Sequence, residues 1–337
     1  MNFKRLVMFA TVLTFGLIML GAYVRLSDAG LGCPDWPGCY GKLTPSHAAA
    51  DIAAAVQQQG GDHGPVSIPK AWKEMVHRYI ASFLGLLIIS IAVMAWRKRD
   101  ELKQSPVLAT ALVGVVCLQG AFGAWTVTLL LKPAIVTGHL IGGMSVLGLL
   151  TWLWLRQTTA ARTVSPPRDS QRLVWLARLG LLVVCAQIIL GGWVSTNYAA
   201  VVCTDFPTCQ GSYWPTMEFN HAFHIVRELG ETPDGKLLNV ASLTAIHFTH
   251  RMGAIVVTAV LLTLALALWR TPGRQALALK VAGVLTLQIA MGIGNVVFHL
   301  PLWLAVLHNG GAALLLVTLI LVNYRLASHR VIPHAGV

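Results

Sequence analysis

Cysteine and histidine side chains recur twice along this chain in the same order. The first set is Cys33, Cys39, His77 and His139, and the second set is Cys203, Cys209, His250 and His308. Each member of the second set follows its counterpart in the first at a nearly constant interval along the chain. Thiols and imidazoles are the side chains of disulfides, redox centres and metal sites. The spacing therefore predicts that two similar halves carry the chemistry.

The four repeated histidines lie in apolar segments at similar depth. An ionisable side chain within a membrane helix is costly, so it usually faces other helices and has a partner. Two facing imidazoles in a four-helix bundle can supply both axial ligands of a heme iron. A single histidine could instead have a structural hydrogen bond, but four repeated positions favour heme ligation. Small residues beside two of the histidines are expected to leave room for the heme: Gly138, Gly142, Gly143, Gly310, Gly311 and Ala312.

The repeat breaks three residues before the first histidine of each half. Glu74 precedes His77, whereas His247 precedes His250. Positions i and i+3 share a helix face, so each of these side chains is expected to lie beside a proposed heme. A desolvated carboxylate can accept protons or stabilise a cationic intermediate, which predicts that only the first site reacts. The alternative is that Glu74 is a solvated acid at a helix start.

An arginine directly follows the first histidine of each half. These residues are Arg78 and Arg251. A guanidinium group matches the carboxylate geometry of heme propionates, which makes both arginines candidate propionate contacts. The alternative is an arginine that only extends its charge to the membrane interface.

The paired cysteines lie in two outer loops, where an oxidising compartment favours local disulfides. The predicted pairs are Cys33 with Cys39 and Cys203 with Cys209. A copper or redox-relay site is the alternative, with His47, His63, His221 or His224 as further ligands. Cys117 and Cys185 fall inside apolar segments and are expected to be packing residues.

The elements that position these residues are membrane helices. The chain has 337 residues, of which 55% are hydrophobic and 11% charged, far below the roughly 25% charged residues of soluble domains. Its apolar runs reach or approach the ~20 residues that span a bilayer. They cover residues 6–26, 76–96, 107–131, 134–155, 173–196, 241–269, 276–298 and 302–324. The predicted fold class is an all-α integral membrane protein with eight transmembrane helices.

The net charge of +12 is distributed as a membrane topology requires. Basic residues cluster at every second predicted membrane boundary, which places both termini in the cytoplasm. The loops 27–72 and 197–240 are then on the outer side and hold most of the acidic residues. The basic charge therefore needs no nucleic acid as a partner, and the lipid bilayer is the expected environment.

The predicted helices divide into two tandem, pseudo-symmetric four-helix bundles. Residues 1–160 form the first bundle, residues 161–172 a cytoplasmic linker, and residues 173–337 the second bundle. Because each half has an even number of helices, both enter the membrane from the same side and form a parallel repeat. A duplicated transporter is one alternative, but its site would lie near the midplane, whereas the histidines lie near the outer face.

Several segments together resemble the heme A synthase family over nearly the whole chain. They are Gly30 to Cys39, Glu74-Met75-Val76-His77-Arg78, Gly138-His139, His247-Phe248-Thr249-His250-Arg251 and Leu307-His308-Asn309. The resemblance implies that His77 and His139 flank the substrate heme O, with Glu74 in the chemistry. It also implies that His250 and His308 hold a heme b cofactor, and that the first outer loop has a disulfide between Cys33 and Cys39.

The resemblance implies oxidation of the C8 methyl group of heme O to a formyl group by two successive hydroxylations. This reaction serves the assembly of heme-copper terminal oxidases in the inner (plasma) membrane, with the cysteine loops on the periplasmic side. Heme O synthase is the expected donor of the substrate. The electron-transfer partner, the oxygen source, a homo-oligomeric state and the roles of His247 and His299 stay open. The alternative function is a b-type cytochrome between quinol and an outer partner, which would not require the difference between Glu74 and His247.

Overall fold

The computed structural model describes residues 2–59, 61, 64, 66–159 and 171–327, which contain helices and no β-strand. Eight of the helices are long and apolar enough to cross a membrane. They are α1 (Phe3–Leu26), α3 (Ile68–Arg97), α5 (Val107–Thr128), α6 (Pro133–Thr159), α7 (Gln171–Thr196), α8 (Val240–Trp269), α9 (Gln275–Val297) and α10 (Leu302–Ala327). The predicted fold class, an all-helical membrane protein with eight spanning helices, is confirmed.

Polar caps begin three of these helices. The side chain of Asn2 accepts a hydrogen bond from the backbone N–H of Arg5, and Asn239 accepts one from Ser242. Ser67 caps α3 in the same way and is followed by a proline in the first turn. Such caps satisfy backbone N–H groups that have no partner within the helix. Because of the Ser67 cap, α3 begins before the predicted apolar run, at Ile68.

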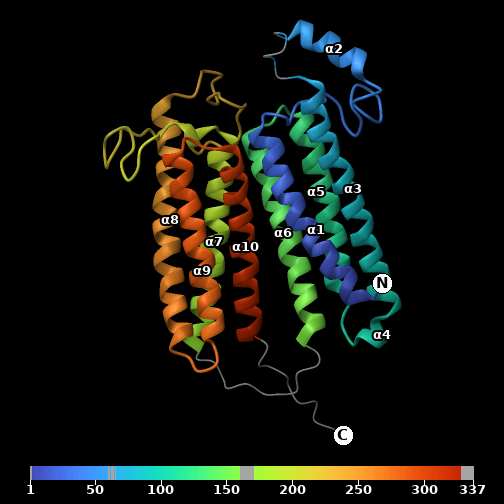
Figure 1. Cartoon of the computed structure of the whole chain (residues 1–337), viewed down its shortest axis with the longest axis vertical. Helices are drawn as coiled ribbons and strands as arrows, with labels where there is room; N and C mark the ends of the chain where they lie inside the picture. The colour runs from blue at the N-terminus through green and yellow to red at the C-terminus, as the bar shows by residue number, and fades with distance from the viewer. Residues whose placement is uncertain (1, 60, 62–63, 65, 160–170, 328–337) are drawn as a thin grey trace.

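The helices pack as two sets of four, which lie side by side in Figure 1. In the first set, α1 and α5 each contact both α3 and α6. In the second set, α7 and α9 each contact both α8 and α10. The helices that carry His77 and His139, and those that carry His250 and His308, therefore lie diagonally across each set. The two sets meet where α10 contacts α1 and α6, and where α6 contacts α7.

The connections differ more between the halves than the helices do. The first long loop contains α2 (Ala49–Gln58), a helix that the sequence pattern did not predict, and Figure 1 shows it beyond the ends of the spanning helices. Its buried residues Ile52 and Ala55 pack in a cluster with both cysteines of that loop. The second long loop has only the short turn η2 (Ala199–Val201), and α4 (Arg99–Leu102) follows α3.

The predicted division of the chain is described only in part. The linker predicted at 161–172 lies outside the described residues except for 171–172, which already belong to α7. The pseudo-symmetry of the halves, their boundaries and the cytoplasmic termini stay predictions.

Candidate functional site

His77 and His139 face each other across the first set of helices. Their ring centroids are 6.4 Å apart, and the ring planes are inclined by 63°. Two metal–imidazole bonds of about 2 Å, together with the distances from ring nitrogen to ring centre, add to about 6 Å. The separation therefore fits one metal ion bound between the two imidazoles, as in a heme with two axial histidines.

Each of the four histidines packs against a glycine on a neighbouring helix. A Cβ atom would lie 3.0 Å from the His77 ring at Gly21 and 3.2 Å from the His139 ring at Gly123. It would lie 3.1 Å from the His250 ring at Gly191 and 3.0 Å from the His308 ring at Gly292. These distances are shorter than ordinary van der Waals contact, so each glycine makes room for an imidazole ring.

The glycines predicted to make room for a heme have different neighbours. A Cβ atom at Gly138 would meet Phe122, one at Gly142 would meet Gln119, and one at Gly310 would meet Met19. These residues therefore allow close helix packing, and the room that they leave for a heme stays a prediction. The glycines that contact the histidines could have been found from the repeat itself. Gly21 with Gly191, and Gly123 with Gly292, are separated by the same interval as the repeated cysteines and histidines.

A glutamine one helical turn before the glycine contacts three of the four histidines. Gln187 Nε2 lies 3.0 Å from His250 Nδ1 and donates to the His250 carbonyl at 2.9 Å. Gln119 donates to the His139 carbonyl at 2.8 Å, and Gln288 Nε2 lies 3.4 Å from His308 Nε2. The corresponding position before Gly21 is Leu17. Sequence reasoning missed this difference.

Glu74 is buried in the first half, with 5% of its surface exposed. Its carboxylate accepts a hydrogen bond of 3.0 Å from the backbone N–H of Cys33 and forms an ion pair of 2.5 Å with Arg78. Glu74 therefore connects α3 with the disulfide loop. The alternative of a solvated acid at a helix start is wrong, because α3 already begins at Ile68 and the carboxylate is enclosed.

His247 holds the corresponding position in the second half and is also buried, with 6% exposed. Its Nδ1 lies 2.9 Å from the carbonyl oxygen of Ala199 in η2. A carbonyl oxygen only accepts, so Nδ1 carries the proton in this hydrogen bond. The imidazole therefore joins α8 to the second cysteine loop through a single hydrogen bond.

The two arginines hold the cysteine loops in the same way. Arg78 donates to the carbonyl oxygens of Asp35 and Gly38 at 2.8 and 2.5 Å. Arg251 donates to those of Asp205 and Thr208 at 3.0 and 2.8 Å. The acceptors occupy equivalent positions of the two cysteine motifs. These donors hold the loops, and contact with heme propionates stays a prediction.

Both predicted cysteine pairs are disulfides in the structure. Cys33 pairs with Cys39, and Cys203 pairs with Cys209, with Cα atoms 4.8 and 4.7 Å apart. Each cysteine loop is therefore closed by a disulfide. In the second loop, a hydrogen bond from the Thr208 side chain is the main cause that lowers the pKa of Asp205, and one from the Gly211 backbone N–H adds to it.

The copper alternative has no cluster of ligands in the part of the chain that the structure describes. No group of three or more His, Cys, Asp or Glu side chains there could hold a metal ion, and His63 lies outside the described residues. His47 bonds to the Thr44 hydroxyl, and His221 lies 4.0 Å from Glu218. Cys185 packs against a buried apolar cluster, as expected of a packing residue, whereas Cys117 is exposed on α5.

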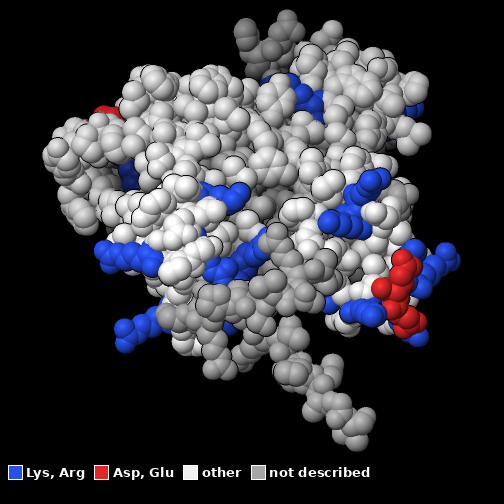
Figure 2. Space-filling view, turned by 60° about the horizontal axis from the view of Figure 1, so that its bottom comes forward, with Lys and Arg blue, Asp and Glu red and all other residues white. Residues whose placement is uncertain are grey.

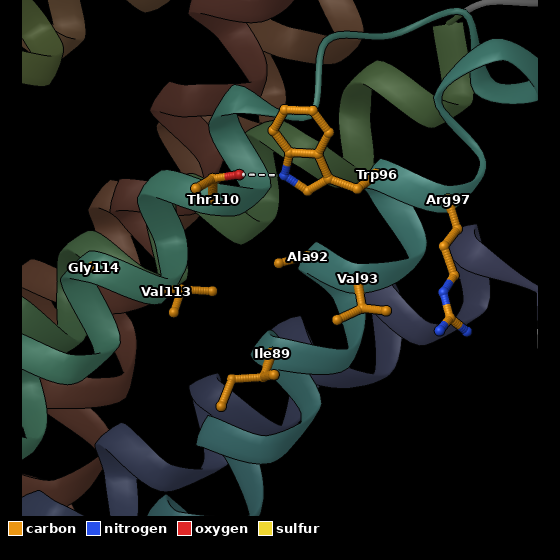
Figure 3. A pocket seen from close by; sticks show the side chains of 8 residues that line it. All are labelled: Ile89, Ala92, Val93, Trp96, Arg97, Thr110, Val113 and Gly114. Atoms are coloured by element: carbon orange, nitrogen blue, oxygen red, sulfur yellow. Dashed lines mark hydrogen bonds between the residues drawn. The ribbon is translucent and has the colours of Figure 1, made fainter.

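An apolar pocket of about 640 Å³ opens between α3 and α5, away from the histidines. Figure 3 shows its lining, with Trp96 donating a hydrogen bond of 2.9 Å to Thr110. Ile89, its lining residue closest in sequence to His77, lies more than three helical turns further along α3, about 18 Å at the rise of an α-helix. The pocket is therefore separate from the facing imidazoles.

Comparisons with known proteins cover most of the chain. Residues 4–320 match the COX15-CtaA family, described as cytochrome oxidase assembly protein. A relative named heme A synthase from Shewanella oneidensis is 44% identical over 313 residues, which are 93% of each chain. Heme A synthases from Hyphomonas neptunium and Halalkalibacterium halodurans are 28% and 27% identical, over 91% and 74% of this chain and 88% and 77% of their own length.

Proposed function

The chain belongs to the COX15-CtaA family of cytochrome oxidase assembly proteins, and from this membership we propose that it catalyses the oxidation of heme O to heme A. The observation that carries the proposal is the facing pair of His77 and His139, with the buried carboxylate of Glu74 one turn away on α3. The second half has a corresponding pair of histidines but lacks the carboxylate. The first half is therefore the reaction site, and the product serves the assembly of heme-copper oxidases.

In the proposed reaction, the C8 methyl group of heme O becomes a formyl group. Two successive hydroxylations give a geminal diol, which loses water to form the aldehyde. His77 and His139 orient the substrate heme from its two faces. Glu74 accepts protons released at the methyl carbon or stabilises that carbon when it is electron-poor. The ion pair with Arg78 and the hydrogen bond from Cys33 hold the carboxylate in place.

The second half is proposed to hold heme b between His250 and His308. Heme b supplies an electron-transfer centre when bound. Gly191 and Gly292 support this assignment, because a Cβ atom at either position would lie within 3.1 Å of an imidazole ring. Arg251 is the candidate propionate contact here, since its buried Nε has no hydrogen-bond partner among the described residues. Arg78 is the corresponding candidate in the first half.

The proposed location is the inner (plasma) membrane, with the cysteine loops on the periplasmic side. Figure 2 shows basic side chains gathered at the end of the helices away from these loops. Arg97, Arg156, Arg270 and Arg325 lie at helix ends on this side, which supports a cytoplasmic location for it. Handover of heme O by heme O synthase, an electron-transfer partner and a homo-oligomer are further parts of the proposal. Residues 1–160 and 173–337 are the proposed substrate and cofactor halves.

Hemes extracted from the wild type and two variants test this assignment. His77→Ala is expected to abolish heme A while the protein retains heme B, and His250→Ala is expected to lose heme B. Both proteins are expressed with heme O supplied, and the hemes are separated by chromatography. A b-type cytochrome would yield heme B alone under the same conditions, and that result for the wild type would refute the proposal.

A further inference from the structure

An apolar groove of about 330 Å³ runs along α1 and begins beside the proposed substrate heme. Six residues of α1, from Phe9 to Leu20, and Ile80 of α3 line it. Leu20 directly precedes Gly21, the glycine that packs against the His77 ring. Ile80 lies one turn beyond His77 on α3. One end of the groove, at Leu20 and Ile80, therefore lies near the imidazole that is proposed to bind the substrate.

The groove has the length and surface of a site for an extended hydrocarbon chain. From Phe9 to Leu20 it follows α1 for about 16 Å at the helical rise. Nothing lies within 4 Å of a Cβ atom placed at Gly16, so the missing side chain leaves the middle of the groove open. The side chains of Phe9 and Val12 are 44% and 66% exposed at its edge.

The second half differs at the two positions in the middle of the groove. Ala186 corresponds to Gly16, and Gln187 corresponds to Leu17, at the interval that relates the two cysteine motifs. The amide of Gln187 is held by hydrogen bonds to His250. A polar, histidine-bound side chain thus replaces an apolar groove residue in the half that is proposed to bind heme b. Heme O differs from heme b in carrying a farnesyl chain.

We propose that the groove lined by α1 and Ile80 binds the farnesyl chain of heme O, and that Gly16 and Leu17 select for this chain. The inference rests on the proposed function, because it requires heme O to lie between His77 and His139. Binding of the farnesyl chain in the groove buries its apolar surface. It also fixes the orientation of the porphyrin between the two histidines. Glutamine at position 17, like Gln187 in the second half, would instead place a polar amide in an apolar groove, where it is a poor neighbour for a hydrocarbon chain.

Titration with heme O and heme B tests the proposal, because the two probes differ in the farnesyl chain. The purified full-length protein, with heme b bound in its second half, is reconstituted in lipid nanodiscs. The wild type is expected to bind heme O at least about tenfold more tightly than heme B at the first site. Gly16→Leu and Leu17→Gln are each expected to remove this preference without changing the affinity for heme B. Ala186→Leu is the matched control in the second half and is expected to keep the preference.

Two results would overturn the inference. Unchanged heme O affinity in Gly16→Leu would show that the groove takes a lipid chain or no ligand. An equal loss of affinity for heme O and heme B in both groove variants would show that the groove supports the porphyrin and not the farnesyl chain. His77→Ala separates this from the proposed function: if heme O binding does not depend on His77, the proposed site fails whatever the groove variants do.

Discussion

At the scale of single residues, the two halves differ most in the groups that precede the first histidine. Glu74 is a buried anion with two donors, the Arg78 guanidinium and the Cys33 backbone N–H. His247 is a buried imidazole with one carbonyl partner. Both side chains join a membrane helix to a cysteine loop, but only Glu74 places a carboxylate at this position. We therefore expect the proton chemistry in the first half.

Glu74→Gln is expected to leave both hemes bound and to lower the yield of heme A by at least about 100-fold, the usual size of a general acid–base contribution. Glutamine is similar in size and keeps an oxygen that can accept from Cys33. Extracted hemes and the absorption spectrum of the purified protein provide the two measurements. His247→Gln is the matched control and is expected to keep most of the turnover. An unchanged yield of heme A in Glu74→Gln would contradict the catalytic role.

The glycines beside the histidines provide a second prediction at this scale. Gly21→Ala places a Cβ atom 3.0 Å from His77 Nε2, and Gly191→Ala places one 3.1 Å from His250. Each change is expected to displace one imidazole, and misplacement by about 1 Å can lower a rate by about 100-fold. Gly21→Ala should therefore reduce heme A while heme B is retained, whereas Gly191→Ala should reduce heme B. The same heme profile in both variants would show that these contacts are not specific to one site.

At the scale of elements, the two cysteine loops are built from the same interactions. Each has a disulfide between cysteines six positions apart, and each has an aspartate that accepts two backbone N–H bonds. An arginine of the following membrane helix donates to carbonyl oxygens of each loop. The loop therefore holds the turn of α3 or α8 that carries the arginine and the adjacent first histidine.

Removal of either disulfide is expected to cost about 2 kcal/mol of stability, because both close loops of the same short length. The double variants are Cys33→Ser with Cys39→Ser, and Cys203→Ser with Cys209→Ser. Thermal unfolding of the heme-loaded proteins measures the cost. The first variant should also lose heme A synthesis, because Cys33 donates to Glu74. Equal loss of synthesis in both variants would contradict a special link between the first loop and the reaction.

At the scale of the whole molecule, Arg25 at the end of α1 joins the two sets of helices. It donates to the Tyr198 hydroxyl at 2.8 Å and to the Ser195 carbonyl at 3.2 Å, both in the second half. Its guanidinium also lies 4.2 Å from the centre of the Tyr198 ring. Burial raises the pKa of Tyr198, so the phenol keeps its proton at neutral pH and donates to Asp28.

Arg25→Gln is expected to destabilise the protein by about 2 kcal/mol, the scale of hydrogen bonds from a charged donor. Tyr198→Phe removes one acceptor and is expected to cost less. If the halves exchange electrons across this interface, Arg25→Gln should also slow heme A formation while both hemes stay bound. Thermal unfolding and a time course of heme A formation give the two measurements. If Arg25→Gln loses no more stability than Tyr198→Phe, the result would contradict a stabilising role for the guanidinium.

Local patterns were enough to predict the spanning helices and the paired cysteines. A run of about 20 apolar residues can satisfy its backbone groups in a bilayer only as a helix, so hydropathy predicted the eight helices without knowledge of their packing. Thiols a few residues apart in an outer loop are close enough to pair wherever that loop lies. The helix α2 was not predicted, because a short helix depends on the cluster into which Ile52 and Ala55 pack.

By itself, the sequence determined that this chain is a membrane protein with four histidines at repeated positions, and that only the first of the two equivalent positions, Glu74 and His247, is a carboxylate. These features depend on residue type and order along the chain. The tertiary structure alone decided which histidines face each other, which glycines leave room for their rings, and that Glu74 is bound by Cys33 and Arg78. Such contacts join residues from different helices and loops, and the helix crossings that bring them together are set by packing over the whole bundle.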